Sequence, residues 1–513
     1  MIKKIVSCII VFYSLSCFAQ DFPPTLTKQK MYEDFDEFIH ILQEANPQLP
    51  VRKVVTGYDQ LDSVKLLRSA IDTIEDYYRF IGLLDHALGY MYDIHAVMAK
   101  QVYEQWDDTT EMDIKMVSEI YTKFRQRGIE LYMKGGGPRW FPCNPSYIDG
   151  NYYIHGFITL TSRDGDTLVL KNVKIISHDN IPYNEYVLKS MFRFQNSVRW
   201  DFKRNQYYST ASSFLKKGEL VIEDENGNID TVNLDMYYGT HVQQFSDTNL
   251  FNHLDFKLQL PTEREKRVFY FEQDKILYIY LNDMNDTENK FIEKVKEVGR
   301  NKELKKVIID VRGNRGGGDP FWNQLLKTIV ADSLIYDVQM AFCNSELMRK
   351  RLGKHAESSK VQTFEWLPNT EFLLTQYVPS YFVPDANSFQ YKGKIYVLQD
   401  EEVFSAGHSL TSYCRHIEQL VSVGEPTGLL AGFGLAPLLY QLKNSKFSFR
   451  LEPAIDVTKV NSAIDVYQCF PEIVIEFPFE EKIKALDYKM FDMQNETCLY
   501  KYDYLFKKVL EME

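Results

Sequence analysis

The sequence predicts an α/β protein with a core in its C-terminal half, a helical N-terminal domain and a β-rich insert between them. From about Val268 to Phe477, apolar runs of strand length alternate with helical stretches, as in a core of parallel strands. Residues 29–100 place apolar side chains at helical spacing, whereas residues 147–235 contain short strand patterns separated by turn dipeptides. A length of 513 residues with 45% hydrophobic content indicates two to four domains.

The first 19 residues have the composition of a secretory signal peptide. Two lysines precede an apolar stretch, Ile5–Phe18, and a small residue, Ala19, ends the segment. We expect cleavage after Ala19; a lipid anchor on Cys17 is the alternative, although Ser14 stands where a lipoprotein signal usually has an aliphatic residue. Because no other run reaches transmembrane length, we expect an exported chain, periplasmic or extracellular, without an integral membrane span.

Charge and cysteine usage argue against several classes of function. The full chain has 59 basic and 71 acidic residues and a formal charge of −12; losing the two lysines of the signal peptide leaves 57 basic residues and −14. An acidic chain without a basic tract is not expected to bind nucleic acid. The mature chain keeps scattered cysteines without CxxC spacing, so we predict no zinc site and no disulfide framework. These are Cys143, Cys343, Cys414, Cys469 and Cys498.

The N-terminal helical domain is predicted over residues 20–135. Phe35, Phe38 and Leu42 recur at helical spacing, and Asn46–Pro50 interrupts the pattern. The pattern predicts helices that bury one apolar face.

The β-rich insert is predicted over residues 136–262. It begins within Gly135–Pro145, a stretch rich in glycine and proline, and contains turn sequences such as Arg163–Gly165 and Glu225–Asn228. The α/β core then covers 263–478, and a helical C-terminal extension covers 479–513.

A glycine-rich loop follows one predicted strand of the core. Val307–Val311 is an almost continuous apolar run, which is typical of a parallel strand covered on both faces. Four glycines occur in the following loop, where a ligand can approach backbone amides closely because no Cβ intervenes. On this pattern alone, the loop is either an oxyanion-binding site or a tight strand-to-helix turn.

A second loop of interest contains Ser405. Lys394–Leu398 reads as a strand and Phe404–Glu418 as a helix, so Ser405 lies at a strand-to-helix turn. There a side-chain oxygen faces the positive end of a helix dipole, which suits a nucleophile. Serine is also a common helix N-cap, and the local pattern leaves both interpretations open.

Together these segments resemble a known family. Asp-Val-Arg-Gly-Asn-x-Gly-Gly-x-Asp at 310–319, Phe-Ser-Ala-Gly at 404–407 and Val-Gly-Glu-Pro-Thr-Gly at 423–428 are similar, in this order, to the C-terminal processing (tail-specific) and tricorn-core serine peptidases. The similarity covers roughly 270–478 and implies a crotonase-like (ClpP/crotonase) catalytic core. Phe141–Ile154 and Lys171–Tyr186 resemble the PDZ-like insert of the same family, more faintly.

The resemblance implies Ser405 as nucleophile and leaves the base to be chosen. In the Ser-Lys form of the family the lysine lies in a stretch that here reads Thr427–Gly434 and contains none. In the tricorn-like triad the histidine precedes the insert, and His95 in Leu84–Val97 matches that place. Imidazole titrates near neutral pH, as a proton shuttle requires. His408, one helical turn after Ser405, is the rival base, although its spacing favours helix packing.

The acid and the oxyanion donors follow less directly from the family pattern. The acid precedes a Gly-x-x-Pro-Asp motif, which here reads Gln468–Glu472, so Asp465 takes the acid's position. The resemblance implies that the backbone amides of Gly316 or Gly317 and of Ala406 form the oxyanion hole. Arg315 stands where many relatives have another glycine.

We therefore predict an exported serine endopeptidase that acts on a polypeptide substrate through an acyl-enzyme and a Ser-His-acid triad. The family uses neither metal nor cofactor. The alternative is a non-catalytic ligand- or peptide-binding protein on the same fold, which the departures at Arg315, Asp465 and Gln468 would fit. A role in assembly through the PDZ-like part is a third possibility. The sequence does not indicate an oligomeric state.

Overall fold

The computed structural model describes most of the chain. The described residues are 23–103, 110, 112–134, 140–141, 145–162, 164–190, 198–209, 215–243, 265–286, 288–375, 378–427, 437–467, 470–488 and 496–512. The predicted signal peptide 1–19 and the alternative anchor Cys17 lie outside them, as do Cys143, Gln468 and Cys469. Within these ranges, no helix combines the length and the apolar character needed to cross a bilayer.

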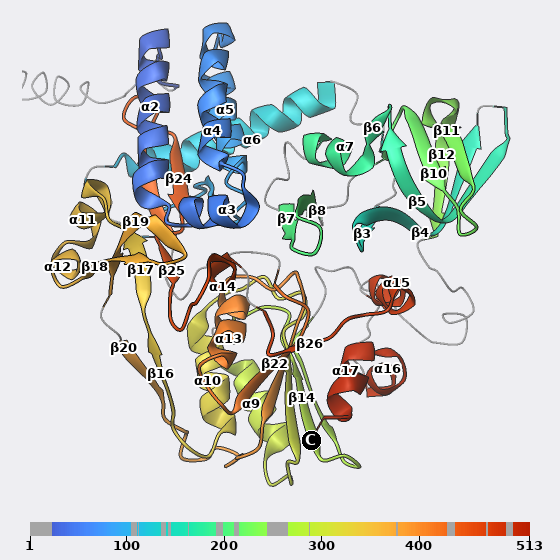
Figure 1. Ribbon diagram of the computed structural model, residues 1–513, viewed down its shortest axis with the longest axis vertical. Helices are drawn as coiled ribbons and strands as arrows, with labels where there is room; N and C mark the ends of the chain where they lie inside the picture. Colours follow the sequence, from blue (N-terminus) through green and yellow to red (C-terminus); the bar gives the residue numbers. More distant parts are fainter. Residues whose placement is uncertain are drawn as a thin grey trace, which may run out of the picture.

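A six-stranded sheet forms the centre of the C-terminal half (Figure 1). Its strands pair in the order β13-β14-β15-β21-β22-β26, and all neighbours are parallel except β13 and β14. They are β13 Arg267–Phe271, β14 Ile276–Tyr280, β15 Lys306–Asp310, β21 Ile395–Gln399, β22 Leu420–Gly424 and β26 Ile473–Val474. The strands predicted at Val307–Val311 and Lys394–Leu398 are confirmed, each displaced by one residue.

Helices cover both faces of this sheet, as the apolar run in β15 predicted. Val307 and Ile309 pack against one set of helices, whereas Ile308 between them faces the other set. The first set is α9 Lys290–Gly299, α10 Asp319–Ile329 and α13 Ala406–Cys414, and the second is α16 Glu496–Tyr502 and α17 Tyr504–Leu510. Arg312 ties the second set to the core, because its guanidinium lies 2.6 Å from Oδ2 of both Asp310 and Asp503.

The N-terminal helices do not bury their apolar faces by themselves. They pack on a small antiparallel sheet, β1-β24-β23, and the Phe38 and Phe449 rings meet with centroids 5.0 Å apart. The elements are α2 Lys28–Ala45, α3 Gln48–Thr56, α4 Gln60–Leu66, η1 Leu67–Thr73, α5 Tyr77–Gly89, α6 Ile114–Lys134, β1 Val97–Met98, β23 Leu438–Gln441 and β24 Ser448–Leu451. Segments around residues 95 and 450 therefore lie side by side.

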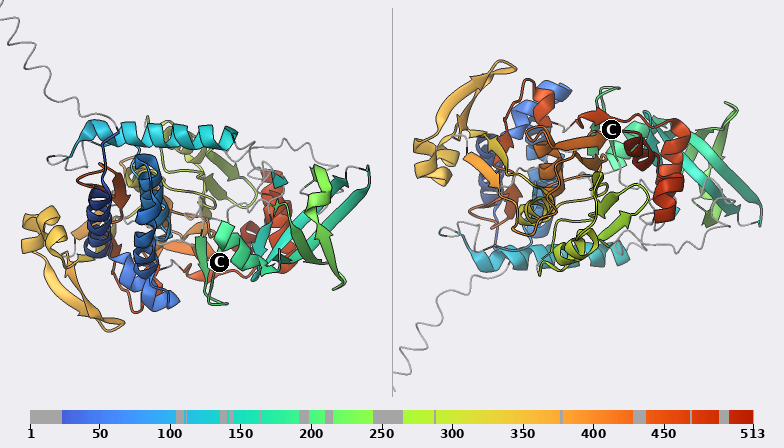
Figure 2. Two further views of the ribbon diagram at one scale, coloured as in Figure 1. Left: turned by 90° about the horizontal axis from the view of Figure 1, so that it is seen from above. Right: turned by 90° about the horizontal axis from the view of Figure 1, so that it is seen from below.

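The middle of the chain forms an antiparallel sheet at the opposite end from the N-terminal helices (Figure 2). This sheet comprises β3 Ser146–Ile148, β4 Asn151–Ser162, β5 Thr167–His178, β6 Ile181–Pro182, β10 Glu219–Glu223, β11 Ile229–Asn233 and β12 Tyr237–Gln243. Helix α7, Tyr183–Ser190, packs on it, and η3 Leu234–Met236 precedes β12. Two further pairs are β2 Trp140–Phe141 with β9 Leu215–Lys216 and β7 Val198–Asp201 with β8 Gln206–Ser209.

The remaining elements extend the core at its edges. The ribbon β16 Leu334–Val338 with β20 Val378–Phe382 leads into the sheet β18 Lys360–Phe364, β19 Leu367–Leu374, β17 Met340–Cys343 and β25 Ala454–Asp456. The short helices are α11 Glu346–Leu352, α12 Lys354–Glu357, α14 Ala463–Tyr467 and α15 Phe479–Tyr488. The Phe479 ring of α15 contacts Tyr153 of the middle sheet, with centroids 5.1 Å apart.

Candidate active site

Ser405 occupies a strained turn between β21 and α13. Its backbone has φ 53° and ψ −127°, a conformation that residues with a side chain rarely adopt. The serine stands at the N-cap position of α13, but its side chain makes no capping hydrogen bond. Ser405 is therefore the N-cap residue by position, but its side chain does not act as a cap. Ala406 is the first residue of the helix, so its amide has no acceptor within the helix.

The glycine-rich loop lies directly against this serine. Gly316 has φ +102°, and a Cβ added there would lie 2.4 Å from the Ser405 Cβ. The Phe404 amide donates to the Asn314 carbonyl at 2.9 Å, which fixes the two loops to each other. Glycine at 316 is required both by its positive φ and by this close approach.

The two candidate glycine amides differ in what they contact. The Gly316 amide donates to Asn314 Oδ1 at 2.8 Å. Around Gly317, the Met284 amide donates to the Gly316 carbonyl at 2.8 Å and the Gly318 amide donates to the Met284 carbonyl at 2.9 Å. In such a parallel bridge the central residue directs its own amide away from the partner. Gly317 is thus better placed than Gly316 to donate to a ligand.

His95 is held by a buried carboxylate from the far end of the chain. Its Nδ1 lies 2.7 Å from Glu452 Oε2, and the Glu452 side chain is completely buried. The pairing register explains the contact, because Val97 faces Arg450 across β1 and β24. Two residues further out along the same antiparallel register, His95 faces Glu452.

The predicted acid Asp465 lies elsewhere. Its Oδ2 accepts hydrogen bonds from the Asn461 amide at 3.0 Å and the Ser462 amide at 2.9 Å, at the start of α14. This is the local role of a short carboxylate at a helix N-terminus. The structure therefore brings Glu452, rather than Asp465, to His95.

The His95 ring reaches the nucleophile turn through Phe404. The two rings meet with centroids 4.6 Å apart, and Phe404 immediately precedes Ser405. Asp93 fixes the backbone on the other side, since its Oδ1 accepts the His95 amide at 2.9 Å. In the described part of the chain, no hydrogen bond joins the imidazole to Ser405, and the two residues are linked through Phe404.

The ionisation of His95 predicts the pH dependence of activity. Burial lowers the pKa of the imidazole, but the hydrogen bond and charge of Glu452, together with the charge of Asp93, outweigh burial, so the pKa of His95 is raised above the usual value for histidine. The resemblance implies that His95 is the general base, which must be neutral, so activity should be lost as the pH falls through this raised pKa. We expect the acidic limb of the kcat/KM profile of peptide hydrolysis at a higher pH than an ordinary histidine would give, and Glu452→Gln should move it to lower pH. A limb that the substitution leaves in place would contradict the pairing.

The rival base His408 is engaged within the core. It is buried, and its Nδ1 lies 3.3 Å from Thr427 Oγ1. This contact is what helix packing predicts for His408. Over the described ranges, no group of three or more histidine, cysteine or acidic side chains is arranged to hold a metal ion.

Comparison with known proteins finds one matching family model and several solved structures of similar fold. Residues 275–475 match the model of peptidase family S41. No curated protein matches the sequence. Among solved structures, mature CPAF is 13% identical, with 95% of this chain and 97% of that chain covered at a TM-score of 0.50, a likeness of fold. A putative peptidase from Parabacteroides merdae is 12% identical, with 94% and 96% covered and a TM-score of 0.42. The tricorn protease is 12% identical, with 95% and 37% covered and a TM-score of 0.33.

Proposed function

The chain is a serine-type peptidase whose residues 275–475 belong to peptidase family S41, and from this premise we propose that it is exported and cleaves internal peptide bonds through an acyl-enzyme. The substrate is a polypeptide.

In the proposed reaction, Ser405 Oγ attacks the scissile carbonyl carbon while His95 takes its proton. The amides of Gly317 and Ala406 bind the oxyanion of the tetrahedral intermediate. His95 then returns the proton to the leaving amine, and the C–N bond breaks to leave an ester on Ser405. Water, activated by the same imidazole, hydrolyses that ester. Glu452 takes the place first assigned to Asp465, orienting the ring and stabilising the imidazolium.

One observation carries this proposal: three distant segments converge on a single point. Ser405 has a strained backbone, Gly316 leaves no room for a side chain beside it, and the imidazole of His95, which is paired with the buried Glu452, packs on the residue before it. Strain of this kind persists where the surroundings impose it, and it concentrates at functional sites. A non-catalytic binder would need none of these three features.

We further propose a separate role for each region of the chain. The core 263–478 is crotonase-like, which its run of parallel strands supports. The region 136–262 is a PDZ-like insert that recognises a substrate terminus or controls access, which its antiparallel sheet and α7 support. The helical region 20–135 supplies the base, and α16 and α17 of the C-terminal extension 479–513 cover one face of the central sheet.

Labelling by a fluorophosphonate tests the proposal. We expect one adduct on the mature protein, mapped to Ser405 by mass spectrometry, and no labelling of Ser405→Ala or His95→Ala. His408→Ala is the matched control for the histidine and should label, because the His408 Nδ1 lies 3.3 Å from Thr427 Oγ1 in the buried core and the proposed reaction gives His408 no role. Failure of a folded wild-type protein to label would overturn catalysis and favour the non-catalytic ligand- or peptide-binding alternative.

A further inference from the structure

The hairpin β7–β8 is a two-stranded ribbon whose first strand is buried on both faces. All four residues of β7 are buried, although the ribbon belongs to neither large sheet. Trp200 pairs with Tyr207 and Arg199 with Tyr208. Because successive side chains point to opposite sides of a strand, Tyr207 and Tyr208 face different partners.

The Tyr207 face contacts the segment that carries His95. The Tyr207 ring lies 4.9 Å, centroid to centroid, from the ring of Tyr92, three residues before the histidine. Tyr92 has φ 48°, a conformation that its surroundings must hold. On its other side, the buried Arg52 guanidinium donates to the carbonyl oxygens of Met91 at 2.7 Å and Tyr92 at 2.8 Å. The strained turn before His95 is therefore fixed between Arg52 and the hairpin.

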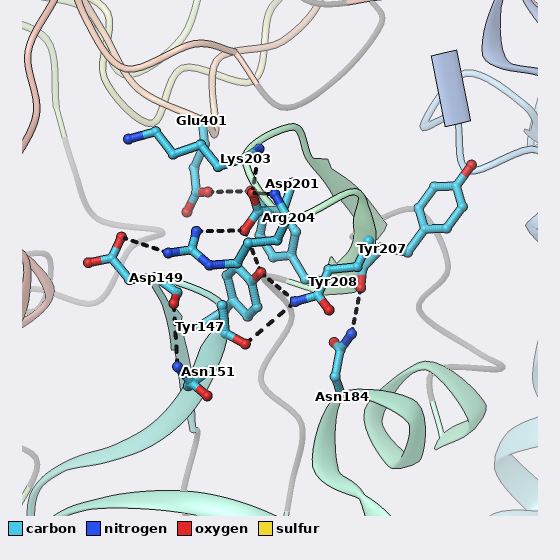
Figure 3. A network of polar contacts seen from close by, with 12 residues as sticks. Tyr147, Asp149, Asn151, Asn184, Asp201, Lys203, Arg204, Tyr207, Tyr208 and Glu401 are labelled. Carbon is cyan, nitrogen blue, oxygen red and sulfur yellow. Dashed lines mark hydrogen bonds and ion pairs between the residues drawn. The ribbon is translucent and has the colours of Figure 1, made fainter. Parts of the chain in front are cut away.

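The Tyr208 face contacts the loop that carries Ser405. The Tyr208 hydroxyl donates to Glu401 Oε2 at 2.7 Å, four residues before the serine (Figure 3). The Tyr208 ring also stacks on Tyr147, with centroids 4.1 Å apart and an interplanar angle of 15°. The neighbouring Asp400 accepts the Gly313 amide at 3.0 Å, which links the same loop to the glycine-rich loop.

We propose that the β7–β8 hairpin positions the catalytic base and the nucleophile relative to each other, with Tyr207 acting through Tyr92 and Tyr208 through Glu401. The inference rests on the proposed function, since it assigns positioning residues to the same reaction. Among the hydrogen bonds and ring contacts of the described residues, neither tyrosine is paired with Ser405 or His95. Their role follows from geometry: the imidazole meets Phe404 without a hydrogen bond to Ser405, so the distance between the pair depends on how the two segments are held.

Tyr208→Phe tests the link to the nucleophile. It removes one hydroxyl that donates to a carboxylate, and we expect kcat for peptide hydrolysis and the rate of fluorophosphonate labelling to fall about tenfold with KM unchanged. Glu401→Ala should do the same, and the double variant should lose no more than either single one. Tyr207→Leu should also lower kcat about tenfold, because it removes the contact between the hairpin and Tyr92.

The matched control is Tyr77→Phe. The Tyr77 hydroxyl is buried and donates to the Ser445 carbonyl at 2.7 Å in the N-terminal core, so its removal breaks a hydrogen bond to neither the Ser405 loop nor the β7–β8 hairpin. We expect a comparable loss of thermal stability with unchanged kcat. Equal effects of Tyr77→Phe and Tyr208→Phe on kcat, or additive effects of Tyr208→Phe and Glu401→Ala, would overturn the inference.

Hydrogen–deuterium exchange separates this inference from the proposed function. Peptides that cover 400–407 should exchange about tenfold faster in Tyr208→Phe than in the wild-type protein. Peptides that cover 90–98 should exchange about tenfold faster in Tyr207→Leu, because each variant removes the contact that restrains one segment. Tyr77→Phe should change neither. If the wild-type protein is not labelled by the fluorophosphonate but the variants show these exchange changes, only the proposed function is overturned. If the wild-type protein is active but the variants exchange at the wild-type rate, the positioning role is overturned.

Discussion

Glu452→Gln is expected to lower kcat for peptide hydrolysis about a thousandfold, whereas Asp465→Asn should leave kcat within about twofold. Glutamine has the shape of glutamate but lacks its charge, so it cannot stabilise the imidazolium that forms during attack. Its amide can also present a donor to Nδ1, which favours the wrong tautomer. Asp465 contacts only local amides in the hydrogen bonds described above, so its change should affect α14 and not the reaction.

The two variants should be compared on one peptide substrate, with circular dichroism to show that both are folded. Because each replaces a carboxylate by its amide, they form a matched pair. Full activity in Glu452→Gln together with inactivity in Asp465→Asn would reverse the assignment of the acid and restore the choice made from the sequence pattern.

Gly316→Ala is expected to abolish detectable labelling at Ser405. The new Cβ would lie 2.4 Å from the Ser405 Cβ, and φ +102° is unfavourable for any residue with a side chain. Since the nucleophile turn and the glycine-rich loop are hydrogen-bonded to each other, neither can move away alone. We expect the free energy of unfolding to fall by about 2–4 kcal/mol from the strain and the overlap.

Gly318→Ala is the control for this prediction. Gly318 has φ −115°, and a Cβ there would meet its nearest neighbour at 3.6 Å, an ordinary contact. We therefore expect Gly318→Ala to label at close to the wild-type rate and to denature in urea near the wild-type midpoint. Equal behaviour of the two variants would show that the loop does not pack on the serine as described.

Local patterns predicted the elements that form this site. The buried apolar runs before each loop identified β15 and β21, and glycine and serine at the following turns marked the two loops that meet. These features depend on short-range rules of strand burial and helix starts, which a sequence displays directly. The position of His95 followed from resemblance, since a single histidine near a helix has no local signature of its own.

The acid could not be found in this way. Glu452 directly follows the short strand β24 and resembles any carboxylate that follows a strand; its contact with His95 depends on which distant segment pairs with β24. Nothing local specifies that register, because 357 residues separate the two partners. Counting back from a family motif led instead to Asp465, whose own hydrogen bonds are a helix-start pattern. The choice between Gly316 and Gly317 likewise depended on Met284, on a neighbouring strand's loop.

The pairing of β1 with β24 also sets when the enzyme can first act. At typical rates of translation, roughly 20 to 70 s pass between the incorporation of His95 and the incorporation of Glu452 into the nascent chain. Until then a ribosome-bound chain carries Ser405 without a completed proton shuttle. Closing so long a loop also raises the contact order, which slows folding. With the proposed triad, hydrolytic competence is therefore a late property of the chain, acquired only after most of the polypeptide exists.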